Sequence, residues 1–101
     1  MSHVLVVGDL MVDVVVAHRE PIATGSDTAA RIRLVGGGSA ANTACWLASL
    51  GESAHLLAAR GADHLGELAA ADLVEAGVVF VGPILDEYPT GTCVVLVSAD
   101  G

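Results

Sequence analysis

The sequence predicts an α/β fold in which helices pack on a parallel sheet and a smaller sheet is appended to it. Two observations lead to this prediction. Short apolar runs alternate along the 101 residues with segments of helical period, an order typical of a parallel sheet with crossover helices. Three further strand-like runs fall outside this alternation, and we interpret them as a separate small sheet.

The parallel sheet is expected to consist of three strands, at residues 3–7, 54–59 and 78–81. The first of these runs is apolar and β-branched and ends at a glycine, which favours a strand buried on both faces. Two helices are expected between the strands. The first spans residues 39–50, and the second spans residues 64–76, where Asp63 is a suitable N-cap and Gly77 a suitable end.

The smaller sheet is expected from the runs at residues 12–17, 30–35 and 92–97. Residues 31–34 alternate arginine with an aliphatic residue, so we expect one face of that strand to be wet. The chain ends in Asp100-Gly101, a dipeptide that favours a hairpin turn. The last strand has no return strand in this sequence, and we interpret the chain as cut within the hairpin.

Composition excludes several classes of function. The chain has twelve acidic residues, four arginines and no lysine, for a net charge of −8. A nucleic-acid-binding protein needs a basic surface, and an anionic membrane would repel this chain. The four histidines have no metal-ligand spacing, so no metal site is expected. The apolar run at the start is too short for a signal peptide, which indicates a cytoplasmic protein.

A glycine run, Gly36-Gly37-Gly38, leads directly into the first predicted helix. Glycines at such a place either let a ligand approach the backbone amides or simply turn the chain. The fingerprints of phosphate loops and of dinucleotide-binding turns are both missing. Two carboxylates, Asp9 and Asp13, follow the first strand, at the edge where open α/β sheets bind their ligands.

Asp13, Gly37, Gly38 and Asn42 together combine hydrogen-bond acceptors with donors. An ionised carboxylate only accepts hydrogen bonds, glycine amides donate them, and an asparagine side chain does both. Such a set suits a neutral polyol, as a sugar or a ribose presents, and Asp9 is a further candidate. Turn and cap roles are the alternatives for Asp9, Asp13 and Asn42.

One segment resembles a known family. Gly37-Gly38-Ser39-Ala40-Ala41-Asn42-Thr43-Ala44, followed by Gly51 and Gly61, is similar to the N-terminal signature of the ribokinase-like (PfkB) carbohydrate kinases. Gly8-Asp9 with Asp13, Gly61-Ala62-Asp63 with Gly66, and Pro89-Thr90-Gly91 also occur in the family's order. The resemblance covers essentially the whole chain. It implies a ribokinase-like three-layer α/β/α sheet, here its N-terminal portion, in which the three extra strands form a small β lid.

The resemblance also implies an activity. Enzymes of this family transfer the γ-phosphoryl group of ATP, with Mg²⁺, to a hydroxymethyl group of a sugar, nucleoside or similar alcohol. The family positions that match Asp13, Gly37, Gly38 and Asn42 bind sugar hydroxyls, and the position of Thr92 or Cys93 lies near the substrate. A lid keeps water from competing with the substrate hydroxyl. The resemblance further implies that two copies can form a homodimer through the lid.

One part of the family pattern is absent. The second signature, Gly-Ala-Gly-Asp, carries the family's catalytic base and lies with the ATP site in the C-terminal part of a longer chain. Gly61-Ala62-Asp63 lacks the second glycine and matches a different position. We therefore expect residues 1–101 to be a partial domain with substrate-binding residues and no catalytic residue, inactive alone. The alternative is a non-catalytic polyol-binding or regulatory module.

Overall fold

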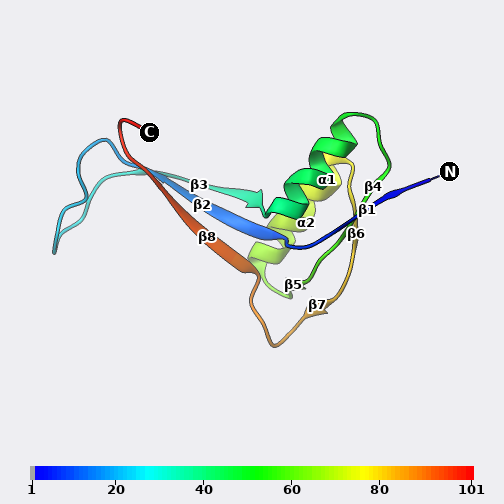
Figure 1. Cartoon of the computed structure of the whole chain (residues 1–101). Helices are drawn as coiled ribbons and strands as arrows, with labels where there is room; N and C mark the ends of the chain where they lie inside the picture. The colour runs from blue at the N-terminus through cyan, green and yellow to red at the C-terminus, as the bar shows by residue number, and fades with distance from the viewer. Residues whose placement is uncertain (1) are drawn as a thin grey trace.

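The computed structural model describes residues 2–101. It consists of a body, made of a parallel sheet and two helices, and of a second sheet that extends away from the body (Figure 1). We call this second sheet the projecting sheet. The Cα radius of gyration is 15.8 Å, whereas a compact chain of this length has about 13 Å. The difference reflects the projecting sheet, which lengthens the molecule to 55 Å.

The body is built on three parallel strands in the order β1-β4-β6. Their bounds are Val4–Val7, Ala54–Leu57 and Val79–Val81. Helices α1 (Ser39–Ser49) and α2 (His64–Ala76) cover one face of this sheet, and the buried core lies between the helices and that face. The α/β class with parallel pairing is therefore confirmed, and α2 has the bounds that its cap residues predict.

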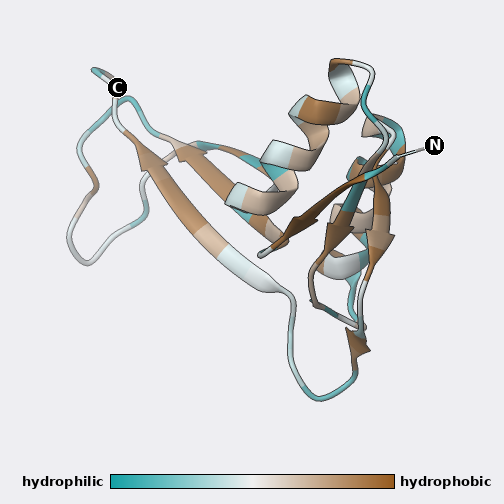
Figure 2. Cartoon of the chain, turned by 45° about the vertical axis from the view of Figure 1, so that its right-hand side comes forward, coloured by the Kyte–Doolittle hydropathy of each residue, from teal (hydrophilic) through white to brown (hydrophobic). Residues whose placement is uncertain are grey.

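Burial of the first strand on both faces, however, is wrong in this structure. The register places Leu5, His55 and Val79 in one row across the sheet and Val7, Leu57 and Val81 in the next. Val7 is 66% exposed and Leu5 57% exposed. Both helices pack on the opposite face, so within residues 2–101 no helix covers these rows, and His55 alone has a ring partner, His3. The ribbons of the three strands are mostly brown in Figure 2.

The projecting sheet contains β2 (Met11–Ala17), β3 (Arg31–Gly37) and β8 (Gly91–Val97) in the order β3-β2-β8. β3 is antiparallel to β2, and β8 is parallel to it. These are the three runs that the sequence assigns to a separate sheet. One expectation fails here: Ile32 is 61% exposed and Leu34 47% exposed, so this part of β3 is open on both faces.

A pair of two-residue strands was not predicted. β5 (Arg60–Gly61) and β7 (Ile84–Leu85) pair in parallel below the body. The predicted strand at 54–59 is correspondingly shorter, because Ala58 and Ala59 connect β4 to β5. Two residues carry no periodicity, so sequence patterns do not detect such strands. Among residues 2–101 no helix is long and apolar enough to cross a membrane.

Candidate functional site

The first strand of the projecting sheet brings Asp13 against the glycine run. A Cβ atom placed on Gly37 would lie 2.6 Å from the carboxylate carbon and from both carboxylate oxygens of Asp13. Gly37 is buried and Asp13 is half-buried. A side chain at this position would displace the carboxylate, so the structure joins two of the predicted site residues in one contact.

The next glycine allows the backbone to enter helix α1. Gly38 is the N-cap residue and has φ 98° and ψ 137°, a region that residues with a side chain rarely adopt. A Cβ atom there would also lie 2.7 Å from the carbonyl oxygen of Asp9. No side chain of its own caps the helix, so the exposed amides of the first turn need another acceptor.

Asp9 supplies that acceptor from the end of β1. Its Oδ1 accepts from the amide of Ala40 at 3.0 Å, and its carbonyl oxygen accepts from the amide of Ala41 at 3.2 Å. The Ala40 amide lowers the pKa of the Asp9 carboxyl below its ordinary value. Asp9 thus acts as an N-cap 31 residues away in sequence. Its role toward a substrate stays a prediction.

Asn42 lies one turn into α1, on an exposed face of the helix. Its backbone amide donates to the carbonyl oxygen of Gly38 at 2.9 Å. Its side chain lines a shallow hollow of about 280 Å³ with Cys45, Trp46 and Ser49. Asn42 is therefore linked to the glycine run through its backbone, and its predicted contact with a sugar hydroxyl stays a prediction.

An acidic residue of helix α2 accepts a hydrogen bond from the glycine run. The amide of Gly36 donates to Oδ2 of Asp72 at 2.9 Å. A Cβ atom on Gly36 would lie 2.8 Å from the same oxygen. The sequence analysis missed this contact because it joins residues 36 positions apart. A contact between an acidic side chain and a glycine amide so far apart in the chain leaves no short sequence motif by which it could be predicted.

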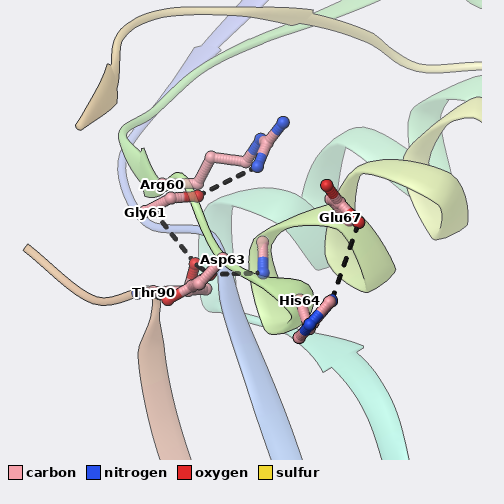
Figure 3. Close-up of polar contacts among 7 residues, drawn as sticks. Arg60, Gly61, Asp63, His64, Glu67 and Thr90 are labelled. Carbon is pink, nitrogen blue, oxygen red and sulfur yellow. Dashed lines mark hydrogen bonds and ion pairs between the residues drawn. The ribbon is translucent and has the colours of Figure 1, made fainter. Parts of the chain in front are cut away.

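A second acid anchors the other edge strand of the projecting sheet (Figure 3). Asp63 is the N-cap of α2, as predicted, and its Oδ1 accepts from the Gly66 amide at 2.8 Å. The same carboxylate accepts from the Thr90 amide at 2.9 Å and from the Thr90 hydroxyl at 2.5 Å. Thr90 is buried and its hydroxyl in turn accepts from the Gly61 amide. This cluster fixes the chain immediately before β8 begins.

These contacts make stability depend on pH. The Thr90 hydroxyl, then the amides of Thr90 and Gly66, hold the pKa of Asp63 below its ordinary value of 3.8. Because the folded-state pKa is lowered, the stabilisation is present above about pH 4 and is lost as the pH falls through the folded-state pKa.

We expect Asp63→Asn to lower the thermal midpoint of unfolding by several degrees at pH 7 and by less near pH 2.5. Thermal melts followed by circular dichroism across this pH range measure the effect. Asp86→Asn, a change at an exposed loop residue, is the matched control. An equal loss for Asp63→Asn at both pH values would contradict the role given to the carboxylate.

The residues implied near the substrate on β8 lie on opposite faces. Cys93 pairs with Asp13 in the register and shares its face of the projecting sheet. Thr92 pairs with Val12 on the other face, and its hydroxyl donates to the Thr90 carbonyl at 3.2 Å. Of the two, Cys93 is the one placed to contact a molecule bound at Asp13.

The larger cavity lies away from these residues. It has about 570 Å³ and is formed at the far end of the projecting sheet by residues 17–20, 29–31 and 97–99. Asp13 and Gly37, by contrast, lie at the base of that sheet, where β2 and β3 begin and end beside the body. Within residues 2–101 no group of three or more His, Cys, Asp or Glu side chains is arranged to hold a metal ion.

Comparisons with known proteins agree on one group. The model of the family described as "pfkB family carbohydrate kinase" matches residues 1–101. The chain is 40% identical, over 103 aligned residues, to the ATP-dependent ribose-1-phosphate kinase of Halopiger xanaduensis, covering all of this chain and 35% of that protein.

Solved structures give the same result. A carbohydrate kinase from Agrobacterium tumefaciens superposes with a TM-score of 0.87 at 27% identity, covering all of this chain and 33% of that one. The Arabidopsis thaliana ribokinase complexed with ribose and ATP superposes with a TM-score of 0.79 at 28% identity, covering 96% of this chain and 32% of that one. The chain thus spans about a third of the length of these relatives.

Proposed function

Because the chain belongs to the pfkB family of carbohydrate kinases, we propose that it is the substrate-binding portion of an ATP-dependent sugar or nucleoside kinase. The acceptor is a hydroxymethyl group of a small polyol. The residues that bind its hydroxyls are Asp13, Gly37, Gly38 and Asn42, with Asp9 at the margin. The relatives named above, one a ribose-1-phosphate kinase and one a ribokinase holding ribose, favour a pentose.

The observation that carries this proposal is the contact between Asp13 and Gly37. It leaves a carboxylate at the junction of body and projecting sheet, beside a backbone with no side chain in the way. A carboxylate in that setting accepts hydrogen bonds from two adjacent hydroxyls, which are the feature that sugars share. Family membership makes the kinase the better account than a non-catalytic polyol-binding module.

Two observations support placing ATP and Mg²⁺ elsewhere in the complete kinase. No carboxylate cluster is arranged for a metal within residues 2–101. The one arginine of the body, Arg60, donates from Nη1 to the carbonyl oxygen of Gly61 and is engaged within its own strand. We propose that the nucleotide is held by a further part of the complete kinase, and that residues 1–101 alone do not turn over.

This chain contributes binding, orientation and exclusion of water. Asp13 and the glycine amides fix the hydroxyls, so that the acceptor hydroxymethyl group keeps one position. The projecting sheet acts as the lid over the bound sugar, tied to α2 through Asp63 at β8 and Asp72 at β3. Both of these contacts lie at the base of the projecting sheet, so the lid moves as one rigid unit about its base. We place the enzyme in the cytoplasm, where its ATP is.

Binding of ribose to this chain tests the proposal directly. Shifts of backbone amide resonances at the base of the projecting sheet support it. Shifts confined to the cavity at the far end of the sheet, or an unperturbed spectrum, contradict it.

We also propose that a second copy of the chain covers the outer face of the lid. That face carries six aliphatic residues in two rows across the sheet: Ile32, Val16 and Leu96, then Leu34, Val14 and Val94. It bears no charge, and Val94 is 63% exposed. Neighbouring exposed apolar residues of this kind mark an interaction surface, whereas single exposed ones do not.

The expected result is a dimer in sedimentation equilibrium that Leu34→Lys converts to a monomer, because a charge on this face would be buried unpaired. Val74→Lys, at a 77% exposed position on α2, is the control that leaves the dimer intact. A monomer in the unsubstituted protein would overturn the proposal.

A further inference from the structure

Three of the four arginines lie on the projecting sheet or beside its strands, although the chain as a whole is strongly acidic. Arg31 and Arg33 belong to β3, and Arg19 follows β2. The body holds only Arg60. A net charge of −8 repels an anionic ligand, so binding one requires a local concentration of positive charge. The projecting sheet has that local charge.

The register places the two β3 arginines on the same face as Asp13. Asp13 is opposite Val35, Arg33 is opposite Val15, and Arg31 is opposite Ala17. Side chains two positions apart on a strand share a face, and they are about 7 Å apart along it. Arg33 therefore lies one such step from the position that pairs with Asp13, and Arg31 lies two steps away.

Neither arginine is engaged by the protein. Both are exposed, and the one ion pair found within residues 2–101 joins His64 and Glu67 on α2, at 4.0 Å. Arg33 and Asp13 are diagonal neighbours, yet they do not pair. The face thus presents a free carboxylate and a free guanidinium at adjacent positions, an acceptor for hydroxyls next to a donor for an anion.

We infer that the substrate bound at Asp13 carries a phosphate monoester, and that Arg33 holds this phosphate. The inference rests on the proposed function and specifies its substrate as a sugar phosphate rather than a free sugar. A guanidinium donates two parallel hydrogen bonds to phosphate oxygens, a geometry that a lysine ammonium does not reproduce. Arg31, one step farther out, adds charge to the same face and bonds only to a longer substrate.

Charged residues on an edge strand can also have a purely structural role, unrelated to any ligand. β3 is an edge of the projecting sheet, and charges there hinder edge-to-edge pairing between molecules. That role predicts aggregation when the arginines are removed and no preference for phosphorylated ligands. It also predicts that replacing Arg33 and replacing Arg31 have equal effects. The phosphate-holding role predicts the opposite on each of these three points.

The test is a titration of the isotope-labelled chain, followed by NMR, with ribose 1-phosphate, ribose and inorganic phosphate as probes. We expect ribose 1-phosphate to shift amides around both Asp13 and Arg33, and to bind at least tenfold more tightly than ribose. Arg33→Gln should raise the dissociation constant for ribose 1-phosphate about tenfold or more and leave that for ribose within about twofold. Arg33→Lys should recover only part of the loss.

Arg19→Gln is the matched control, since it removes the same charge at the far end of the projecting sheet, beyond the last paired residue of β2 and away from Asp13. An equal loss with Arg19→Gln would show a general electrostatic effect and overturn the inference. The inference is also overturned if inorganic phosphate and ribose 1-phosphate cause equal amide shifts and these shifts do not include the amide of Asp13. If Arg33→Gln changes nothing while Asp13→Ala abolishes ribose binding, the proposed function stands and the phosphate assignment falls. If ribose and ribose 1-phosphate both leave Asp13 unperturbed, the proposed function fails as well.

Discussion

Replacing Asp13 by alanine in the complete kinase is expected to reduce kcat/KM for its sugar by about 100-fold or more. The carboxylate lies against Gly37, and, unlike those of Asp9 and Asp72, it accepts no hydrogen bond from the described residues. Each charge-assisted hydrogen bond contributes about 1.5–3 kcal/mol, and two lost bonds to adjacent hydroxyls give this factor. Both kcat and KM should change, because the same contacts bind the sugar and orient its hydroxymethyl group.

Asp13→Asn separates charge from shape. The amide keeps the size of the side chain and one acceptor oxygen, so its loss should be smaller than that of alanine. Asp27→Ala, in the exposed loop between β2 and β3, is the control and should leave kcat/KM unchanged. Steady-state kinetics with an ATP-coupled assay measure all three variants. An Asp13→Ala enzyme with unaltered kcat/KM would remove Asp13 from the site.

Substituting alanine for Gly38 is expected to destabilise the fold by about 3 kcal/mol or more. The backbone there has φ 98°, and a Cβ atom would lie 2.7 Å from the Asp9 carbonyl oxygen. Backbone strain alone costs about 1–3 kcal/mol, and the clash adds to it by pushing Asp9 off the start of α1. Helix α1 packs on the core of the body, so loosening its first turn affects the whole molecule.

Gly25→Ala is the matched control for this substitution. Gly25 also has a positive φ, 70°, but no atom lies within 4 Å of the Cβ position. Its cost should therefore be the backbone strain alone, about 1 kcal/mol. Urea unfolding of both variants gives the comparison. A Gly38→Ala protein as stable as Gly25→Ala would show that the entry into α1 adapts without cost.

Short sequence signals, such as helix caps and strand-like runs, predicted the helices and most of the strands. The Asp63 cap and Gly77 gave α2 its bounds. The site indicated by the glycine run and Asn42 stays a prediction. The order of the strand-like runs along the chain separated the two sheets, because strand propensity and spacing are properties of short segments. Grouping Asp13 with the glycines and Asn42 followed from their hydrogen-bonding chemistry, and the resemblance to the kinase family added the lid.

Tertiary contacts explain what sequence patterns missed. Asp9 and Asp72 both accept from backbone amides, 31 and 36 positions away, and an acid carries no mark of such a distant partner. The open face of β1 was missed for another reason. A fully apolar strand is typical of a sheet that is covered on both faces. Within residues 2–101 the helices cover only one face of this sheet.

The central claim is that this chain binds a sugar through the junction of body and projecting sheet. An NMR titration with ribose, recorded on the unsubstituted chain and on Asp13→Ala, tests it most directly. The account predicts saturable shifts at the amides of Asp13, Gly37, Gly38 and Asn42 in the unsubstituted chain and their loss in the variant. Equal shifts in both proteins, or no shift at the glycine run, would contradict it.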